Sequence, residues 1–132
     1  MATQHINPEA VSKPNNYTHV VAAEGRRIVF VSGQVAIDKD GNVVGKGDLA
    51  RQAEQVFENL KACLASAGAT FADVTKMTTF IVNYRPEHRT MIADLRRRYL
   101  PADKPPASTL LGVQSLATPD ILIEIEATAV LP

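Results

Sequence analysis

The sequence contains a single cysteine, no tryptophan and no excess of either charge. The lone cysteine, Cys63, excludes an intrachain disulfide framework and suits a reducing cytoplasm. Its 14 basic side chains balance 14 acidic ones, which argues against a nucleic-acid partner or an anionic-membrane surface. No apolar run reaches the roughly 18 residues of a membrane-spanning helix, and the polar start is unlike a signal peptide. We therefore expect a cytoplasmic protein with no membrane partner.

Metal-ligand and cofactor motifs are also missing. The three histidines, His5, His19 and His88, are scattered without the spacing of a metal site. The acidic turn at residues 38–42 lacks the glycine and glutamate spacing of a calcium loop. We expect no metal and no cofactor.

The chain is long enough to bury a core without disulfides or metals. It has 132 residues, of which 45% are hydrophobic and 21% charged, an ordinary balance for a globular protein. Repeats, low-complexity segments and internal linkers are absent. The sequence predicts one domain over residues 1–132.

The last strand organises the predicted fold. From Ile121 to Val130 the pattern has period two: isoleucines and alanines fall on one face, and Glu124 and Glu126 on the other. The first face is apolar enough to lie under helices. The acidic face must then look into water, a cleft or a partner subunit.

Two helices and four more strands precede this element. Strands are predicted at residues 17–22, 27–32, 74–82 and within 105–113, the first two forming a hairpin after an irregular lead-in at residues 1–16. A helix over residues 49–67 follows the N-cap Asp48 and ends at Gly68. A second helix opens at Pro86. Its predicted buried side is Met91, Ile92, Leu95 and Tyr99, opposite Arg89, Asp94 and Arg96 to Arg98.

This order, β-β-α-β-α-β-β, predicts an α+β sandwich of two layers, with both helices on one face of a mixed sheet. The other face would stay uncovered within one chain. Several side chains cannot all be hidden by two helices: Met77, Thr79, Phe80, Leu110, Leu111, Leu122 and Thr128. A large semi-apolar open face is usually a subunit interface, so we expect a homo-oligomer.

Several motifs occur together along the chain, from about Tyr17 to Val130. They resemble the RidA/YjgF family in their order as well as their content. The matching segments are residues 30–35 (FVSGQV), 58–62 (ENLKA), 67–68 (AG), 74–80 (VTKMTTF) and 123–127 (IEIEA).

The resemblance implies a fold, an assembly and an activity. The family fold is similar to chorismate mutase, a six-stranded sheet backed by two helices, and three subunits pack sheet to sheet with a small-molecule cleft at each interface. Active members hydrolyse reactive enamines and imines to a keto compound and ammonia. The resemblance places Tyr17 and Gly33 in the cleft and gives a catalytic role to Glu124, which could orient water or move a proton.

One departure from the family pattern concerns the residue that binds the substrate carboxylate. The family carries an arginine in a Pro-Ala-Arg-Ser segment, and this chain has Ser108 there, followed by Thr109. Leu110 replaces a frequent cysteine, and Ala93 a helix asparagine. A serine hydroxyl cannot compensate the charge of an anionic substrate. One arginine among Arg85, Arg89 and Arg96 to Arg98 could supply the missing cation across an interface, although this set otherwise predicts a solvated helix face.

Three functions therefore remain open. The first is an enamine/imine hydrolase with altered substrate preference, in which Ser108 and Thr109 bind the ligand. The second is a non-catalytic small-molecule-binding or regulatory trimer. The third is an endoribonuclease, a label that some relatives carry, but the neutral charge and the lack of interleaved aromatic and basic residues weigh against it.

Overall fold

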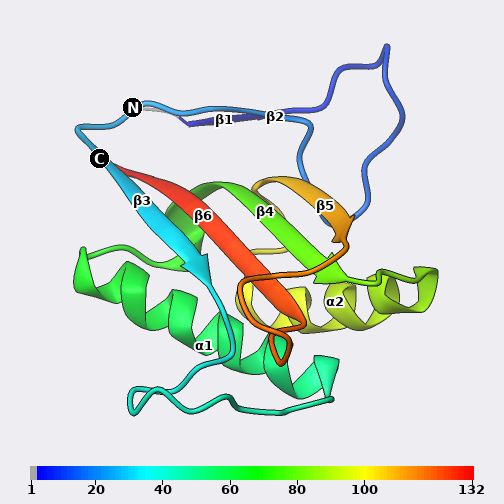
Figure 1. The fold of residues 1–132 in the computed structure, drawn as a ribbon. Helices are drawn as coiled ribbons and strands as arrows, with labels where there is room; N and C mark the ends of the chain where they lie inside the picture. The colour runs from blue at the N-terminus through cyan, green and yellow to red at the C-terminus, as the bar shows by residue number, and fades with distance from the viewer. Residues whose placement is uncertain (1–2) are drawn as a thin grey trace.

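Two helices cover one face of a four-stranded sheet (Figure 1). The computed structural model describes residues 3–132. The sheet order is β3-β6-β4-β5, from strands β3 (Arg27–Gln34), β4 (Val74–Val82), β5 (Ala107–Val113) and β6 (Ile123–Leu131). The helices are α1 (Leu49–Ser66) and α2 (Pro86–Tyr99), and a single 3₁₀ turn, η1 (Phe71–Asp73), precedes β4. The predicted α+β class, with both helices on one face, is confirmed.

The chain has six strands, but they form two sheets, one of four strands and one of two. The predicted element order contained neither β1 nor a second sheet. A short strand β1 (Gln4–Ile6) lies within the predicted irregular lead-in and pairs antiparallel with β2 (Val20–Ala22). The predicted hairpin of residues 17–22 with 27–32 is therefore wrong. β3 pairs with β6 instead, because β6 offers a long alternating partner whose apolar face continues that of β3.

Strand β6 lies between β3 and β4 and is antiparallel to both, while β5 runs parallel to β4. Its predicted alternation is confirmed. Ile123, Ile125 and Ala129 are fully buried against the helices. Glu124 and Glu126 lie on the opposite face, beside Phe80 and Thr78 of β4. The sheet thus holds a row of acidic and polar side chains away from the core.

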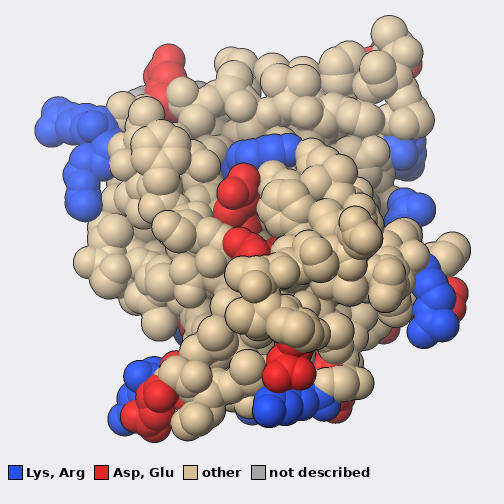
Figure 2. Space-filling view, viewed as in Figure 1, with Lys and Arg blue, Asp and Glu red and all other residues tan. Residues whose placement is uncertain are grey.

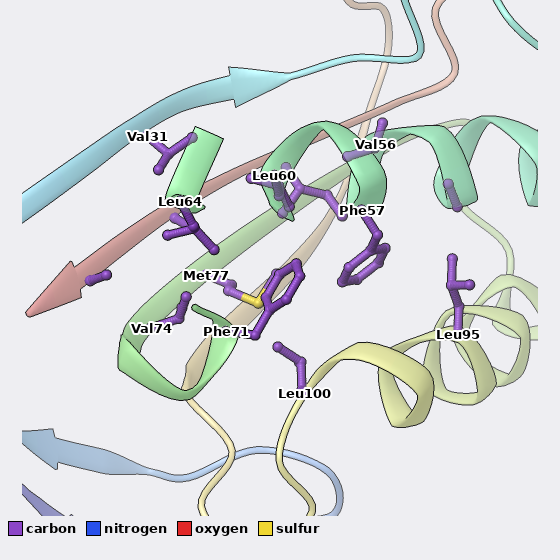
Figure 3. Close-up of a cluster of buried hydrophobic side chains, with 14 of the residues drawn as sticks. Val31, Val56, Phe57, Leu60, Leu64, Phe71, Val74, Met77, Leu95 and Leu100 are labelled. Carbon is purple, nitrogen blue, oxygen red and sulfur yellow. The ribbon is translucent and has the colours of Figure 1, made fainter. Parts of the chain in front are cut away.

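The core lies between α1, α2 and the covered face of the sheet (Figure 3). Helix α1 begins where Asp48 Oδ1 accepts a hydrogen bond from Arg51 N, and it is followed by Gly68 at φ 78°, as predicted. Its stripe packs with Phe71 of η1 and Met77 of β4, and the α1 members that Figure 3 labels are Val56, Phe57, Leu60 and Leu64.

Part of the predicted open face belongs to this core. Met77 and Thr79 are 0% and 2% exposed, so their assignment to the uncovered face is wrong. Their register decides it: Met77 pairs with Ala127 and Thr79 with Ile125, both on the helix side. β4 is rich in β-branched residues on both faces, and periodicity alone does not orient such a strand.

The uncovered face nevertheless exists, and it is apolar along both edge strands, β3 and β5. Ile28 and Phe30 of β3 are 62% and 79% exposed, and Leu111 of β5 is 39% exposed. In the same view as Figure 1, Figure 2 shows acidic and basic atoms meeting near the centre of this surface, over β6 and β4, within a mostly uncharged surround. We call this surface, formed by the outward residues of β3, β6, β4 and β5, the open face.

Candidate functional site: a cavity under helix α2 and a carboxylate on the open face

A cavity of about 710 Å³ lies between α2, the start of β5 and the segment that precedes β2. Its lining comes from β4, α2, β5 and the loop segments that carry Tyr17 and Tyr84. The lining side chains include Tyr17, Thr79, Ala93, Arg96, Ser108 and Leu110. Since all belong to the helix-covered side of the sheet or its edge, the cavity lies behind β5 and away from the open face.

Hydrogen bonds to the chain just before β5 fix the segment that carries Tyr17. Thr18 N donates to Pro106 O at 3.1 Å, and Thr18 Oγ1 donates to Pro105 O at 2.5 Å. Asn16 adopts a positive φ of 65°, which turns the chain toward this contact. Tyr17 and Ser108 are thus held at one cavity although they are far apart in the sequence.

Arg96 reaches into the same place from α2. Its Nη1 donates to Ser108 Oγ at 3.0 Å, and its Nη2 donates to the carbonyl oxygen of Asn16 at 3.1 Å. The residue is only 8% exposed. The prediction of a solvated arginine at residue 96 is therefore wrong. Arg96 is the arginine of this set that lies beside Ser108, where the family carries its arginine, and it belongs to the same chain.

The electrostatics set Arg96 apart from its neighbours on α2. Burial lowers the pKa of the Arg96 guanidinium because desolvation disfavours the charged form. Arg85, Arg97 and Arg98 are more than half exposed and pair with Glu87, Asp94 and Glu54 respectively. Among the residues that the structure describes, Arg96 has no carboxylate partner of this kind.

Helix geometry explains why Arg96 points inward. The inward-facing set includes Ile92, Leu95 and Tyr99, and residue 96 is four positions after the first and three before the last. Its angular position on the helix therefore predicts burial, whereas its residue type predicts exposure. Sequence reasoning followed the residue type for the whole set and kept Arg96 only as one of five arginines that could replace the missing cation across an interface.

A second group of predicted residues lies on the other side of the sheet. Glu124 extends over Gly33, at the irregularity that interrupts the pairing of β3 with β6 between Val31 and Gln34. A Cβ atom built on Gly33 would lie 1.9 Å from Glu124 Oε2. Space, rather than a positive φ, requires glycine here, since the carboxylate packs directly on the backbone.

Thr109 belongs to the open face as well. Its partner across the strands is Thr78, and it accepts a hydrogen bond from Lys76 Nζ at 2.6 Å. Successive side chains of a strand point to opposite faces, so Ser108 and Thr109 do not share a site within one chain. The structure brings Tyr17 and Ser108 together in the cavity and places Gly33, Thr109 and Glu124 on the opposite surface.

Two other features of residues 3–132 bear on function. Their His, Cys, Asp and Glu side chains form no group of three or more that could hold a metal ion. Within the same range, no helix is both long enough and apolar enough to cross a membrane.

Comparison with known proteins identifies the family. The sequence model of the family described as Endoribonuclease L-PSP matches residues 8–131. A RutC family protein of Pyrococcus abyssi is 33% identical over 130 residues, which cover 98% of both chains. The crystal structure of YyfB, of the conserved Rid protein family of Yersinia pestis, is 41% identical, has a TM-score of 0.93, and covers 99% of this chain and 100% of its own. The chain belongs to the RidA/YjgF family.

Two further relatives agree with this assignment. Protein DfrA of Myxococcus xanthus is 32% identical over 131 residues, covering 98% of this chain and 97% of its own. The crystal structure of RidA from an Antarctic Psychrobacter is 25% identical with a TM-score of 0.69, over 97% of this chain and 99% of its own. The predicted RidA/YjgF resemblance is confirmed.

The departures from the RidA/YjgF pattern gather in one place. Ala93, Ser108 and Leu110 all line the cavity that also contains Tyr17. Arg96, which the family motifs did not flag, fills the space beside Ser108. The change at residue 108 is thus part of a rearranged cavity lining rather than an isolated loss.

Proposed function

We propose that this protein is a homotrimeric hydrolase of reactive imines and enamines, with a small-molecule cleft at each subunit interface. The observation that carries the proposal is the division of the candidate residues. Tyr17, Arg96 and Ser108 face the cavity behind β5, whereas Gly33 and Glu124 lie on the open face. A sheet separates the two groups within one chain, so a site that uses both needs two chains.

The exposed apolar residues support the assembly part of the proposal. Ile28, Phe30 and Leu111 leave a surface that burial against another copy would remove from water, a gain of about 25 cal/mol per Å² of apolar area. When the open face of one subunit meets the β5 edge of the next, Glu124 of one chain approaches the cavity of the other. Thr109 would then lie in the interface between the two subunits. A cytoplasmic location is part of the same proposal.

The chemistry needs one group that moves protons near a carbonyl-like carbon. An enamine takes a proton at its terminal carbon, and the resulting iminium ion loses a proton from nitrogen to become an imine. Water then adds to the imine carbon while the nitrogen gains a proton, and the resulting carbinolamine expels ammonia and leaves a keto compound. Glu124, partly exposed on the open face, takes the proton from the attacking water and returns it to the departing nitrogen.

The decisive measurement is hydrolysis of 2-iminopropionate formed in situ by an amino-acid oxidase, with semicarbazide as a competing trap for the imine. The protein should raise the rate of pyruvate and ammonia release and lower the yield of semicarbazone. Glu124→Gln should abolish that effect. If the wild-type chain binds the keto product but never accelerates hydrolysis, it is a non-catalytic binding protein of the same family.

The same preparations also test the ribonuclease label attached to the family model. Structured and single-stranded RNA should stay intact at micromolar protein. Cleavage that persists at constant specific activity through purification and disappears in Glu124→Gln would overturn the imine-hydrolase proposal in favour of ribonuclease activity.

A further inference from the structure

We propose that Arg96, supplied by α2, binds the carboxylate of an anionic ligand in the cavity behind β5, in place of an arginine on the strand. The inference deepens the function proposed above and rests on it for the identity of the ligand as a 2-imino acid. The binding claim itself is independent of turnover. It follows from burial, charge and hydrogen bonding around a single side chain.

Burial without a counter-ion is the first argument. Arg96 is 8% exposed, and both of its hydrogen-bond partners, the Ser108 hydroxyl and the Asn16 carbonyl, are neutral. Neutral oxygens satisfy donors but do not compensate a charge, and a buried unpaired cation is costly. A bound carboxylate would supply the missing negative charge.

Unused hydrogen-bonding capacity is the second argument. A guanidinium group carries five N–H donors in a planar fork. Two hydrogen bonds of the Arg96 group are accounted for, and they hold the plane in place from two sides. The remaining donors suit a carboxylate that binds through both oxygens, and the fixed plane reduces the entropy lost on binding.

The charge of the cavity lining is the third argument. Arg89, Arg96 and Arg97 line it, and among the described lining residues Asp94 is the single acidic one. Asp94 already pairs with Arg97. An excess of positive charge therefore faces the cavity, which favours an anion over a neutral ligand of the same shape.

The test compares a charged and a neutral ligand of nearly equal shape. Pyruvate and its amide, pyruvamide, are titrated by calorimetry into the wild-type protein and into Arg96→Met, which keeps most of the side-chain volume and removes the charge. Wild-type protein should bind pyruvate more tightly than pyruvamide by roughly tenfold or more, as expected for a charge-assisted contact. Arg96→Met should remove that preference and leave the affinity for pyruvamide unchanged.

Two further variants separate binding from a structural role. Arg98→Met is the matched control, because Arg98 lies on the same helix but pairs with Glu54 on the surface, and its preference for pyruvate should equal that of the wild type. The exchange Arg96→Ser with Ser108→Arg returns a guanidinium to the strand and should restore the preference. If Arg96→Met fails to fold, Arg96→Gln replaces it in the same titrations, because an amide keeps hydrogen-bond donors and removes the charge.

The outcomes distinguish an anion-binding role of Arg96 from a purely structural one. If Arg96→Met lowers the thermal stability but still prefers pyruvate, Arg96 is only a brace between Asn16 and Ser108, and the inference is wrong. It is equally wrong if the wild-type protein shows no preference for the charged ligand. If the preference depends on Arg96 while 2-iminopropionate hydrolysis is absent, the anchor stands and the hydrolase proposal falls.

Discussion

The Glu124 carboxylate fills the space above Gly33 that any larger residue would need, with Oε2 1.9 Å from the position of a Cβ atom. The position of the Glu124 carboxylate therefore depends on the absence of a side chain at residue 33. We predict that Gly33→Ala displaces the carboxylate and lowers imine hydrolysis by roughly two orders of magnitude, since small misplacements of catalytic groups have effects of this size.

Steady-state rates and a double-mutant comparison check this prediction. Combined with Glu124→Ala, which empties the space, Gly33→Ala should cost little additional stability, so the two changes should be non-additive in urea unfolding. Additive costs would show that the contact does not couple the two residues.

Glu124 and Glu126 provide a matched pair on one strand. Both point to the open face, but Glu126 is exposed and lies opposite Thr78, away from Gly33. We predict that Glu124→Gln lowers the hydrolysis rate by about 10²- to 10⁴-fold, the range for loss of a general acid–base. Glu126→Gln should stay within about twofold of wild type, and equal losses in both variants would remove the special role of Glu124.

The exposed aromatic Phe30 tests the role of the open face. We predict that Phe30→Asp converts the protein into monomers, because a charge would be buried without a partner in the interface. Analytical ultracentrifugation at micromolar concentration measures this directly. The control Lys61→Asp changes an exposed residue of α1, on the covered side of the sheet, and should leave sedimentation unchanged. A wild-type protein that sediments as a monomer would overturn the assembly.

A site shared between chains makes complementation possible. We predict that Arg96→Met and Glu124→Gln chains, each impaired by roughly tenfold or more at subsaturating substrate, recover activity when unfolded and refolded together. Random assembly of equal amounts leaves about one quarter of the interfaces with both side chains intact, so about one quarter of wild-type activity should return. Mixing the folded variants without exchange is the control. No recovery on co-refolding would place both residues in sites within one chain.

The buried amide of Gln52 connects α1 to the chain that leads into β6. Its Nε2 donates to Asp120 O at 2.8 Å and Gly45 O at 3.1 Å, and its Oε1 accepts from Leu122 N at 2.9 Å. We predict that Gln52→Leu destabilises the protein by about 2 kcal/mol, because Asp120 O and Leu122 N lose their hydrogen-bond partner, whereas Gly45 O still accepts from Asp48 N. Urea unfolding measures the loss, and Gln55→Leu, which loses one partly buried contact with Asn59, should cost less than about 1 kcal/mol.

Sequence patterns predicted the elements that have a clear period. The bounds of β4, the caps of α1 and the alternation of β6 follow from hydrophobic spacing and capping chemistry, and the structure has them as predicted. The pairing of β1 with β2 did not follow, because strands of three residues show no period. Which face of β4 is covered depends on its register with β6, and that information lies outside the strand itself.

The candidate site was predictable in its residues but not in its arrangement. Motif resemblance singled out Tyr17, Gly33, Ser108 and Glu124, and only the fold shows that a sheet divides them. Arg96 was assigned to solvent because of its charge. Its spacing from Ile92 and Leu95 carried the correct information, and a charged residue at an inward position is the pattern that deserved more weight.

The contact between Arg96 and Ser108 makes the charge of the cavity depend on both positions. Arginines at both would bring like charges within hydrogen-bonding range, and small neutral residues at both would leave the cavity without its buried cation. Residues 96 and 108 together therefore determine whether the cavity contains a buried guanidinium, so neither position alone predicts the charge that a ligand meets there.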